Sequence, residues 1–479
     1  MYIYMQFPWK STLFLEKNAM RSLSLSAQSG RLRQLPIQAL IHTAGDILRL
    51  PKDAGGCKRV FTPWFTFWLF LLQVLGSART CRESLRHAQA WISGEREISP
   101  NTSAYCQARA RLPLEYIEKA AESIQKHLQK NEGGAWLNRR VIVVDGSSVS
   151  LPDTPENQAL YPQSGKQKPG CGFPSLHFTA LFSLAAGAWL ALAKGSRFVQ
   201  ERTLFRQLWN YLKEGDVALG DRGFCGFAEY WLLLQRGVDS VMRLHARRSA
   251  GCKKVRRLGK DDWLVEWIKA PHPPKWMDKE TWKNMPETLL IRHVEIQVSN
   301  PGFRTQSITV ATTLLDPEAY PAQDIADLYR RRWHVELFLR DIKITLGMDV
   351  LRCKTPALVH KELLFHQIAY NLVRAFMLEA ARRRQEAPLR DPLRLSLTGA
   401  CAAIRQWAPA LCGERSRAGK IALLDTLFRC IGQDVIPLRP DRMEPRAKKR
   451  RAKQYQLLSQ PRSTFKEIQH RKRYVKPLS

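Results

Sequence analysis

The segment VIVVDGSSVSLPD, residues 141–153, opens with four consecutive β-branched residues and continues with an acid and a glycine. An uninterrupted apolar run of this kind is typical of a strand buried on both faces of a sheet. Before it, between about residues 30 and 131, apolar positions recur every three or four residues, as in a helix. The sequence therefore predicts a helical N-terminal region followed, near residue 140, by a mixed α/β domain.

The α/β domain is predicted to continue with two apolar strands in residues 177–195, on either side of an Ala-Gly turn. A helix is expected in residues 201–212 and a short strand in residues 216–224. Between about residues 245 and 317 the composition shifts to Lys, Arg, Trp and Pro with short alternating strands, which predicts an inserted β-rich subdomain. A long helical stretch is expected from Asp324 onward.

The charge of the chain indicates a polyanionic partner. Its 479 residues carry a formal net charge of +33 with an isoelectric point near 10.1, far more than solubility requires. Nucleic acid is the leading candidate, although a basic balance is shared by membrane-surface proteins and several kinds of nuclease. The motifs must therefore decide between these classes.

Neither the cysteines nor the termini indicate secretion. The ten cysteines are scattered without a CxxC pair, which favours free thiols in a reducing compartment over a zinc site. The start lacks a signal-peptide pattern, and the apolar run at residues 60–76 contains Pro63 and Gln73 and is too short for a typical membrane span. We expect this run to be a buried core helix, and the protein to be cytoplasmic, associated with the nucleoid and without a membrane partner.

Two acids follow apolar strands at positions where the chain can turn. Asp145 is predicted to close the first strand and precedes Gly146, and Asp221 lies between Gly220 and Gly223 where the apolar strand in residues 216–224 is predicted to end. Strand ends next to glycine are typical places for ligand-binding side chains, because the backbone can approach a ligand closely there. The alternative for each acid taken alone is an Asx turn that caps the loop.

A third acid lies in the segment DLYRRRWHVELFLRDIK, residues 327–343. On one continuous α-helix Tyr329, Arg332, Glu336 and Lys343 would fall within roughly 60° of one another, in a stripe about 21 Å long. Such a stripe could follow several nucleotides of a DNA strand. The alternative is a surface helix with an ordinary ion pair between Arg332 and Glu336, which have the i, i+4 spacing.

Together, three carboxylates can bind hard divalent cations, which suits Mg²⁺ and phosphoryl transfer on DNA without a covalent protein nucleophile. The sequence lacks HExxH, GxxxxGK[ST] and GxSxG. Metalloprotease, nucleotide-driven motor and serine hydrolase functions therefore have no motif to support them.

These segments resemble those of the insertion-sequence 4 family of bacterial transposases. VVDGSSVSLPDTPEN and GDRGF match the segments of the first two catalytic acids, and the signature Tyr, two residues, Arg, three residues, Glu, six residues, Lys is met in full at residues 329–343. The resemblance implies a ribonuclease-H-like α/β fold with Asp145, Asp221 and Glu336 as catalytic and metal-binding residues. It also implies that Tyr329, Arg332 and Lys343 bind DNA phosphates.

The resemblance implies an organisation of the whole chain: a helical N-terminal DNA-binding region (1–135), a ribonuclease-H-like catalytic domain (139–245 and 318–385), a β-rich insertion (246–317) and a helical C-terminal region with a basic tail (386–479). Two Mg²⁺ ions are expected, with Mn²⁺ as a substitute. The expected partners are double-stranded DNA, as transposon ends and target, and a second copy of the chain on that DNA.

The resemblance also implies that an aromatic residue of the insertion stacks on a base flipped out of the DNA end. The candidates are Trp263, Trp267, Trp276 and Trp282, and the alternative for each is core packing. Two rival functions stay open at this point. One is a metal-dependent nuclease that never joins strands, and the other is an inactive element product that binds DNA without chemistry.

Overall fold

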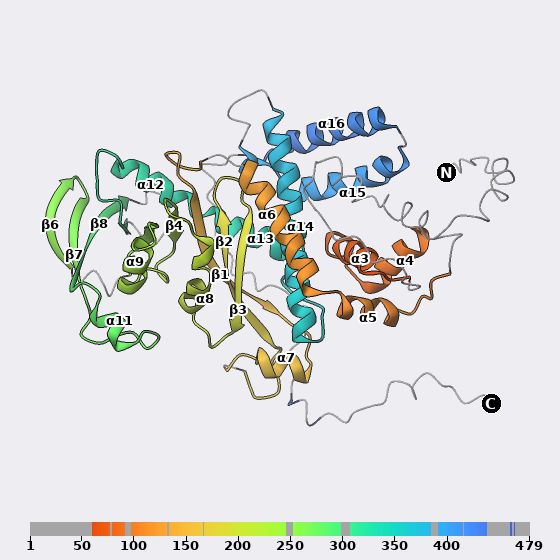
Figure 1. The fold of residues 1–479 in the computed structure, drawn as a ribbon, viewed down its shortest axis with the longest axis horizontal. Helices are drawn as coiled ribbons and strands as arrows, with labels where there is room; N and C mark the ends of the chain where they lie inside the picture. Colours follow the sequence, from red (N-terminus) through yellow and green to blue (C-terminus); the bar gives the residue numbers. More distant parts are fainter. Residues whose placement is uncertain are drawn as a thin grey trace.

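The computed structural model (Figure 1) describes most of the chain between residues 60 and 437. The described residues are 60–76, 79–91, 97–131, 134–165, 167–245, 252–297, 307–384, 391–414 and 416–437, with 460, 461 and 464. The first 59 residues and the basic segment RPDRMEPRAKKRRAKQY, which the sequence analysis assigned to the C-terminal tail, lie outside this part.

The described strands form one nine-stranded sheet in the order β3-β2-β1-β4-β5-β9-β8-β7-β6. β1 pairs in parallel with β4, and β4 with β5, whereas all other neighbours are antiparallel. The fold is therefore mixed α/β, as predicted. The strands are β1 (Val141–Ser150), β2 (Ser175–Ser183), β3 (Trp189–Ser196), β4 (Val217–Gly220), β5 (Asp239–Arg243), β6 (Cys252–Gly259), β7 (Asp262–Ile268), β8 (Thr288–Gln297) and β9 (Ser307–Thr312).

Helices cover the sheet and build a second layer beside it (Figure 1). The described helices are α3 (Pro63–Leu75), α4 (Cys81–Trp91), α5 (Ser103–Arg111), α6 (Leu114–Asn131), α7 (Pro155–Leu160), α8 (Glu201–Gln207), α9 (Phe227–Leu234), α11 (Lys279–Lys283), α12 (Ala322–Arg331), α13 (His334–Arg340), α14 (Pro356–Arg382), α15 (Leu397–Gly413) and α16 (Arg417–Gln433), with short 3₁₀ turns at Trp209–Tyr211 and Pro392–Arg394.

The apolar run at residues 60–76 folds as the core helix α3. Its side chain at Thr62 caps the first turn by accepting a hydrogen bond from the Phe65 amide, and Pro63 occupies the first helical position, where no amide hydrogen is needed. The Phe70 ring packs on Phe365 of α14 with centroids 4.2 Å apart. In the part of the chain that the structure describes, no helix has both the length and the apolar character needed to cross a membrane.

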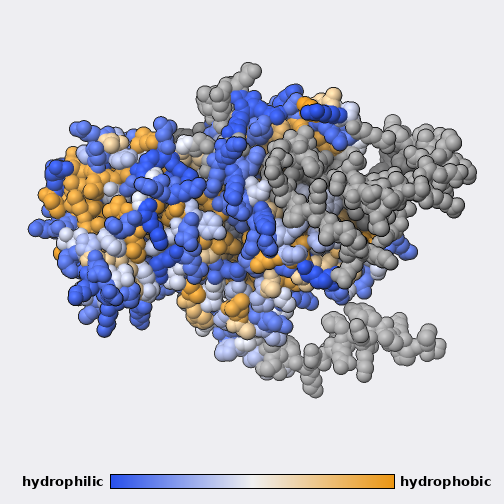
Figure 2. Space-filling model, viewed as in Figure 1, coloured by the Kyte–Doolittle hydropathy of each residue, from blue (hydrophilic) through white to orange (hydrophobic). Residues whose placement is uncertain are grey.

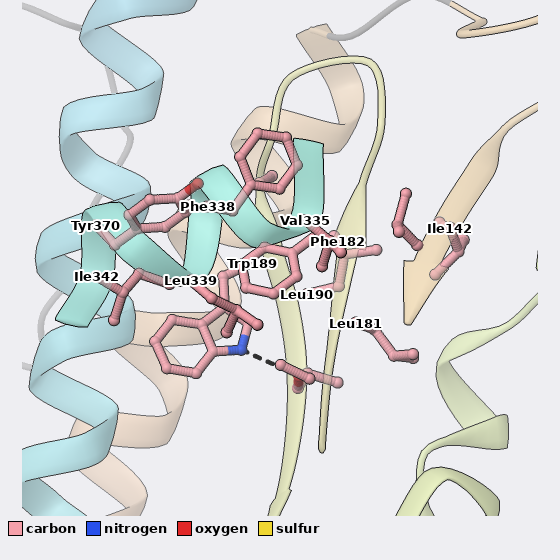
Figure 3. Packing of buried hydrophobic residues seen from close by; sticks show 14 of the residues in the cluster. Ile142, Leu181, Phe182, Trp189, Leu190, Val335, Phe338, Leu339, Ile342 and Tyr370 are labelled. Atoms are coloured by element: carbon pink, nitrogen blue, oxygen red, sulfur yellow. Dashed lines mark hydrogen bonds between the residues drawn. The ribbon is translucent and has the colours of Figure 1, made fainter. Parts of the chain in front are cut away.

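Helix α13 lies on the sheet and is fixed there by apolar packing (Figure 3). Its residues Val335, Phe338 and Leu339 are buried. The Phe338 ring contacts Phe182 of β2 at a centroid distance of 5.5 Å, and Phe182 in turn packs on Trp189 of β3 at 5.9 Å. This packing sets the position of Glu336, which lies on the same helix.

The strands predicted as a separate insertion extend the same sheet. β9 pairs with β5 of the central strands and with β8, so β6, β7 and β8 continue the sheet at its far edge. Hydrophilic residues cover most of the face seen in Figure 2, with an apolar area at the end that carries these strands. The expected boundaries of the insertion, residues 246–317, stay a prediction.

A buried ion pair ties this extension to the segment that returns toward the central strands. Arg292 of β8 donates to both carboxylate oxygens of Asp262, at 2.9 and 2.6 Å. Its remaining nitrogen donates to the carbonyl oxygens of Leu314, Asp316 and Tyr320. Because the arginine is fully buried, these contacts take the place of hydration by water.

Arg292→Met is expected to lower the free energy of unfolding by about 3–5 kcal/mol, because the buried Asp262 carboxylate would lose its partner. Urea unfolding followed by tryptophan fluorescence measures this change. The control is Arg256→Met, which removes an exposed arginine of β6 and should change stability by about 0.5 kcal/mol or less. Equal stability of the two variants would contradict a structural role for the pair.

Candidate active site

Asp145 and Asp221 lie at equivalent positions on two neighbouring parallel strands. The register pairs Val143 of β1 with Leu219 of β4, and each acid follows two residues later. β4 ends at Gly220, so Asp221 begins the turn that follows it. Because adjacent strands are only about 4.8 Å apart, this register brings the two carboxylates to the same edge.

The structure corrects one detail of the prediction for Asp145, which does not close its strand. β1 continues to Ser150 and pairs with β2 throughout, with Asp145 opposite Ala180. What ends at this point is the pairing with β4, because β4 stops while β1 runs on. The acid therefore lies where the sheet opens on one side of β1, and the Asx turn considered above is absent because Gly146 is part of the strand.

Backbone amides hold both carboxylates. The Gly146 amide donates to Oδ1 of Asp145 at 2.8 Å, and the Gly223 amide donates to Oδ1 of Asp221 at 2.7 Å. Because the Gly223 amide lies two residues after Asp221, this contact is an Asx turn, the alternative considered above for this acid. These contacts fix one oxygen of each acid.

Negative charge accumulates around Asp145. Burial raises its pKa to about 7, and the charges of Asp221 and Glu201 add to the effect. The Gly146 amide and the Arg332 guanidinium act in the opposite direction without cancelling it. A cation bound nearby would therefore stabilise the charged form of the Asp145 carboxyl group.

Sequence reasoning missed Glu201, a fourth acid at this edge. It lies in the first turn of α8, and a Cβ atom at Gly146 would come within 2.3 Å of its Oε1. Partial burial of the carboxylate and the charge of Asp221 raise the pKa of Glu201. The segment before it carries no spacing relative to Asp145 that could have revealed this approach.

Arg332 links Glu336 to Asp145, one of the two strand acids. The Arg332 guanidinium donates to Oε1 of Glu336 at 3.0 Å and also acts electrostatically on Asp145. Tyr329 is buried, and burial raises its pKa to about 12, with Asp221 among the charges that act on it. Charge interactions thus connect Tyr329 and Arg332 to the two strand acids.

The prediction that one continuous α-helix carries all four signature residues is wrong. α12 ends at Arg331, and the amides of Arg332 and Trp333 bond to carbonyls three residues earlier, which tightens the turn before α13 begins at His334. After α13 the chain forms a π-helical turn over Asp341–Thr345. A single straight stripe therefore does not exist.

Lys343 lies in this π-helical turn and faces β1. Its Nζ donates to the Ser148 carbonyl oxygen at 2.9 Å and to the Ser147 hydroxyl at 3.3 Å, and pairs with Asp349 at 3.1 Å. The lysine thus holds the helical segment against the strand that carries Asp145. π-Helical turns inserted in α-helices are frequent at functional sites.

The side chains do not form a closed metal cage. Within the described ranges, no group of three or more His, Cys, Asp or Glu side chains is arranged to hold a metal ion. Asp145, Asp221 and Glu201 act on one another electrostatically, whereas Glu336 is engaged by Arg332.

Comparisons with known proteins identify relatives of this chain. The sequence model of a family described as the transposase DDE domain matches residues 136–372. Over 395 residues the chain is 28% identical to transposase InsG for insertion sequence element IS4 of Escherichia coli strain K12, with 81% of this chain and 85% of that relative covered. The chain belongs to the insertion-sequence 4 family of DDE transposases. The resemblance inferred from the sequence is confirmed, and the protein is a DNA transposase.

Other relatives of this transposase match less of it. It is 39% identical over 67 residues to the transposase for insertion sequence element IS421 of Escherichia coli, which covers 14% of this chain and 17% of that relative. Among solved structures, a cryo-EM structure of the piggyBac transposase synaptic complex with hairpin DNA aligns with a TM-score of 0.40 and 8% identity, covering 87% of this chain and 85% of that one. DDE transposases generally use divalent metal ions.

The four tryptophans named as candidates for base stacking differ in their surroundings. Trp267 and Trp282 are buried, and the Trp267 indole donates to His293 at 2.9 Å. Trp263 lies beneath the ammonium group of Lys254, 4.2 Å from its ring centroid. Trp276 is 39% exposed with the Arg206 guanidinium 3.8 Å from its ring centroid. Of the four, Trp276 is thus exposed and Trp263 is half-buried, each with a cationic side chain over its ring.

Proposed function

We propose that Asp145, Asp221 and Glu336 are the catalytic carboxylates of this transposase and that they bind Mg²⁺, two ions in the working complex, for which Mn²⁺ can substitute. The observation that carries the proposal is the parallel register of β1 and β4, which brings two acids together at the edge where the sheet opens. The raised pKa of Asp145 supports it, because burial and the neighbouring carboxylates disfavour its charged form, which a bound cation would stabilise.

The strand order supports a ribonuclease-H-like catalytic core. The run β3-β2-β1-β4-β5 combines an antiparallel meander, β3-β2-β1, with two strands, β4 and β5, that continue parallel to β1. The first acid lies on β1 and the second directly follows the neighbouring strand β4. The β-rich extension enters between β5 and α12, so it separates Asp221 from Glu336 in sequence.

The donor set fits hard divalent cations, because every proposed ligand is a carboxylate oxygen. When bound, such ions supply an activated water or 3′-hydroxyl and stabilise the leaving oxygen of an in-line displacement at a phosphodiester. Asp145 and Asp221 are held by backbone amides, which leaves their second oxygens available. Glu336 would have to exchange its contact with Arg332 for the ion.

We propose that three further residues bind the DNA phosphate and position the acids: Arg332, Tyr329 and Lys343. Arg332 orients Glu336 and can turn its planar guanidinium toward a phosphate, for which its donor geometry is suited. Lys343 fixes the π-helical turn to β1 through the Ser148 carbonyl. Positive charge next to the carboxylates also offsets charge that develops on a reacting phosphate.

Arg332→Ala is expected to slow strand transfer about 10–100-fold, because residues that orient a metal ligand commonly contribute that much. Rates of joined-product formation with purified protein measure the effect. The control is Arg330→Ala: this arginine is on the same helical segment but is exposed and pairs with Asp327, so its removal should leave the rate nearly unchanged. A loss shared equally by both variants would point to general charge instead of positioning.

The proposed partner is double-stranded DNA, both as element ends and as target, bound by two copies of the chain so that two ends are held in one assembly. The charge of +33 supports a polyanionic partner. The edge strand β6 supports it further, because its residues 253–257 include four exposed basic side chains. DNA of the nucleoid in a bacterial cytoplasm is the proposed place of action.

The test is a strand-transfer assay with the full chain, DNA carrying the element's own ends, and either Mg²⁺ or EDTA. Joined products that require Mg²⁺ are the expected result. Cleavage without joining would replace transposition by a nuclease activity. DNA binding with neither cleavage nor joining, in Mg²⁺ and in Mn²⁺, would leave an inactive element product.

A further inference from the structure

Three cysteines converge far from the carboxylates, where the N-terminal helices meet α14. Cys81 opens α4 and Cys106 lies in α5, and their Sγ atoms are 3.9 Å apart. Cys353 precedes α14 and faces the same cluster through Arg109. Chain segments separated by 25 and by 244 residues thus bring three thiols around one guanidinium.

Arg109 is the unusual member of this cluster. It is only 6% exposed, and its side chain donates to sulfur atoms: Cys106 Sγ at 3.6 Å and Cys353 Sγ at 3.9 Å. Its other neighbours are the rings of Phe70 and Tyr105, at 4.9 and 5.2 Å, and its Nε has no hydrogen-bond partner. In the described part of the chain, no carboxylate forms an ion pair with it.

A buried charge is costly unless negative charge lies nearby. The buried Glu362 carboxylate acts electrostatically on Arg109 without forming an ion pair with it, and the sulfur atoms that accept the hydrogen bonds of Arg109 are the second source of negative charge. The hydrogen bond between the Cys81 and Cys106 sulfurs lowers the pKa of the Cys106 thiol, and the Arg109 charge acts in the same direction, against the effect of burial. Burial raises the pKa of Cys353, and the nearby Glu362 carboxylate adds to this, so Cys353 stays protonated.

Cys106 accepts a hydrogen bond from the Arg109 guanidinium at 3.6 Å, so of this pair it is the sulfur placed to be the thiolate, with Cys81 as the thiol next to it. Both residues are partly exposed, so a small solute can reach them. The same arrangement disfavours a zinc site, because the guanidinium already occupies the positive position between the sulfurs. Among the described residues, no group of three or more His, Cys, Asp or Glu side chains, this cluster included, is arranged to hold a metal ion.

We propose that Cys106 and Cys81 form a peroxide-reactive dithiol, a modification site separate from the DNA-cleaving centre. The Cys106 thiolate attacks one oxygen of hydrogen peroxide, the O–O bond breaks, and Cys106 sulfenic acid and hydroxide form. Cys81 sulfur then attacks the Cys106 sulfur, and the sulfenic oxygen leaves as water with the Cys81 proton. The two sulfurs lose two electrons, and one peroxide becomes two waters once hydroxide takes up a proton.

The geometry requires a small movement. The two sulfurs must approach by about 1.9 Å to reach the disulfide length of about 2.05 Å. The disulfide joins α4 to α5 and removes the thiolate that balances Arg109. Disulfides that form in reducing compartments are usually transient and redox-sensing, and low-pKa accessible thiols beside a resolving cysteine are typical of them.

The first test uses the full-length protein treated with hydrogen peroxide and mapped by mass spectrometry after digestion. The expected product is a peptide pair joined through Cys81 and Cys106, lighter by about 2 Da because two thiol hydrogens are lost. In Cys81→Ser the reaction should stop at Cys106 sulfenic acid, which dimedone captures. Cys430→Ser, at a partly exposed thiol of α16, is the matched control and should behave as wild type. A disulfide at other positions, or no dimedone adduct at Cys106, would overturn the proposal.

The second test concerns Arg109 and does not depend on disulfide formation. At pH 7 iodoacetamide should modify Cys106 roughly tenfold faster than Cys430, because more of it is thiolate. Arg109→Gln should move the midpoint of the Cys106 alkylation profile upward by about one pH unit, whereas Arg111→Gln, on the same helix, should not. An unchanged midpoint in Arg109→Gln would contradict the role of the guanidinium in stabilising the Cys106 thiolate. Equal alkylation rates at Cys106 and Cys430 would contradict the assignment of Cys106 as the thiolate.

Discussion

Asp145→Asn is expected to reduce strand transfer about a thousandfold while leaving DNA binding intact. The amide removes one negative charge from the group that Asp221 and Glu201 already crowd, so the affinity for a divalent cation falls. A bound ion contributes several kcal/mol to phosphoryl transfer, and a loss of about 4 kcal/mol corresponds to roughly a thousandfold in rate. Joined products in the strand-transfer assay, and a gel-shift assay on the same DNA, measure the two effects.

The matched control for this variant is Asp327→Asn on α12. Its carboxylate is exposed and pairs with Arg330, so the same chemical change should leave strand transfer unaffected. Asparagine has nearly the same shape as aspartate, and β1 should therefore keep its pairing with β2. Strand transfer by Asp145→Asn within a few-fold of wild type would contradict the metal-binding role, as would equal losses in both variants.

The first two acids could be predicted because local sequence determines where they lie. A β-branched run followed by an acid and a glycine predicts a buried strand, and the neighbouring strand before Asp221 has the same character. Sequence alone did not reveal that β1 continues past Asp145. That continuation depends on pairing with β2, whose register is a property of the assembled sheet.

The rest of the site depends on contacts between distant segments. The π-helical turn at Lys343 is held by the Ser148 carbonyl of β1, 195 residues away in sequence, so helical periodicity could not indicate it. Glu201 reaches the edge because α8 begins beside Gly146. The pairing of Cys81 with Cys106 likewise arises from the packing of α4 on α5. In each case a tertiary contact overrides what spacing along the chain suggests.

The second large effect is expected in DNA binding, and it concerns the basic residues of the edge strand β6. Its residues Lys253, Lys254, Arg256 and Arg257 are all exposed, and β6 is the last strand in the order of the sheet. If a binding surface neutralises six to ten phosphates, affinity for DNA falls about 10³–10⁵-fold between 50 and 200 mM salt. Wild-type protein is expected to behave in this way in fluorescence-anisotropy titrations.

Replacing these four residues of β6 by alanine should make the plot of log affinity against log salt shallower by about 3–4, since each lost phosphate contact removes about 0.9 from the slope. The control is Lys119→Ala with Lys126→Ala on α6, where each lysine already pairs with a glutamate four residues earlier. Basic residues on an edge strand can also act by preventing strand pairing between molecules. An unchanged slope together with aggregation of the β6 variant would favour that role, whereas a shallower slope with a monodisperse protein requires phosphate contacts on β6.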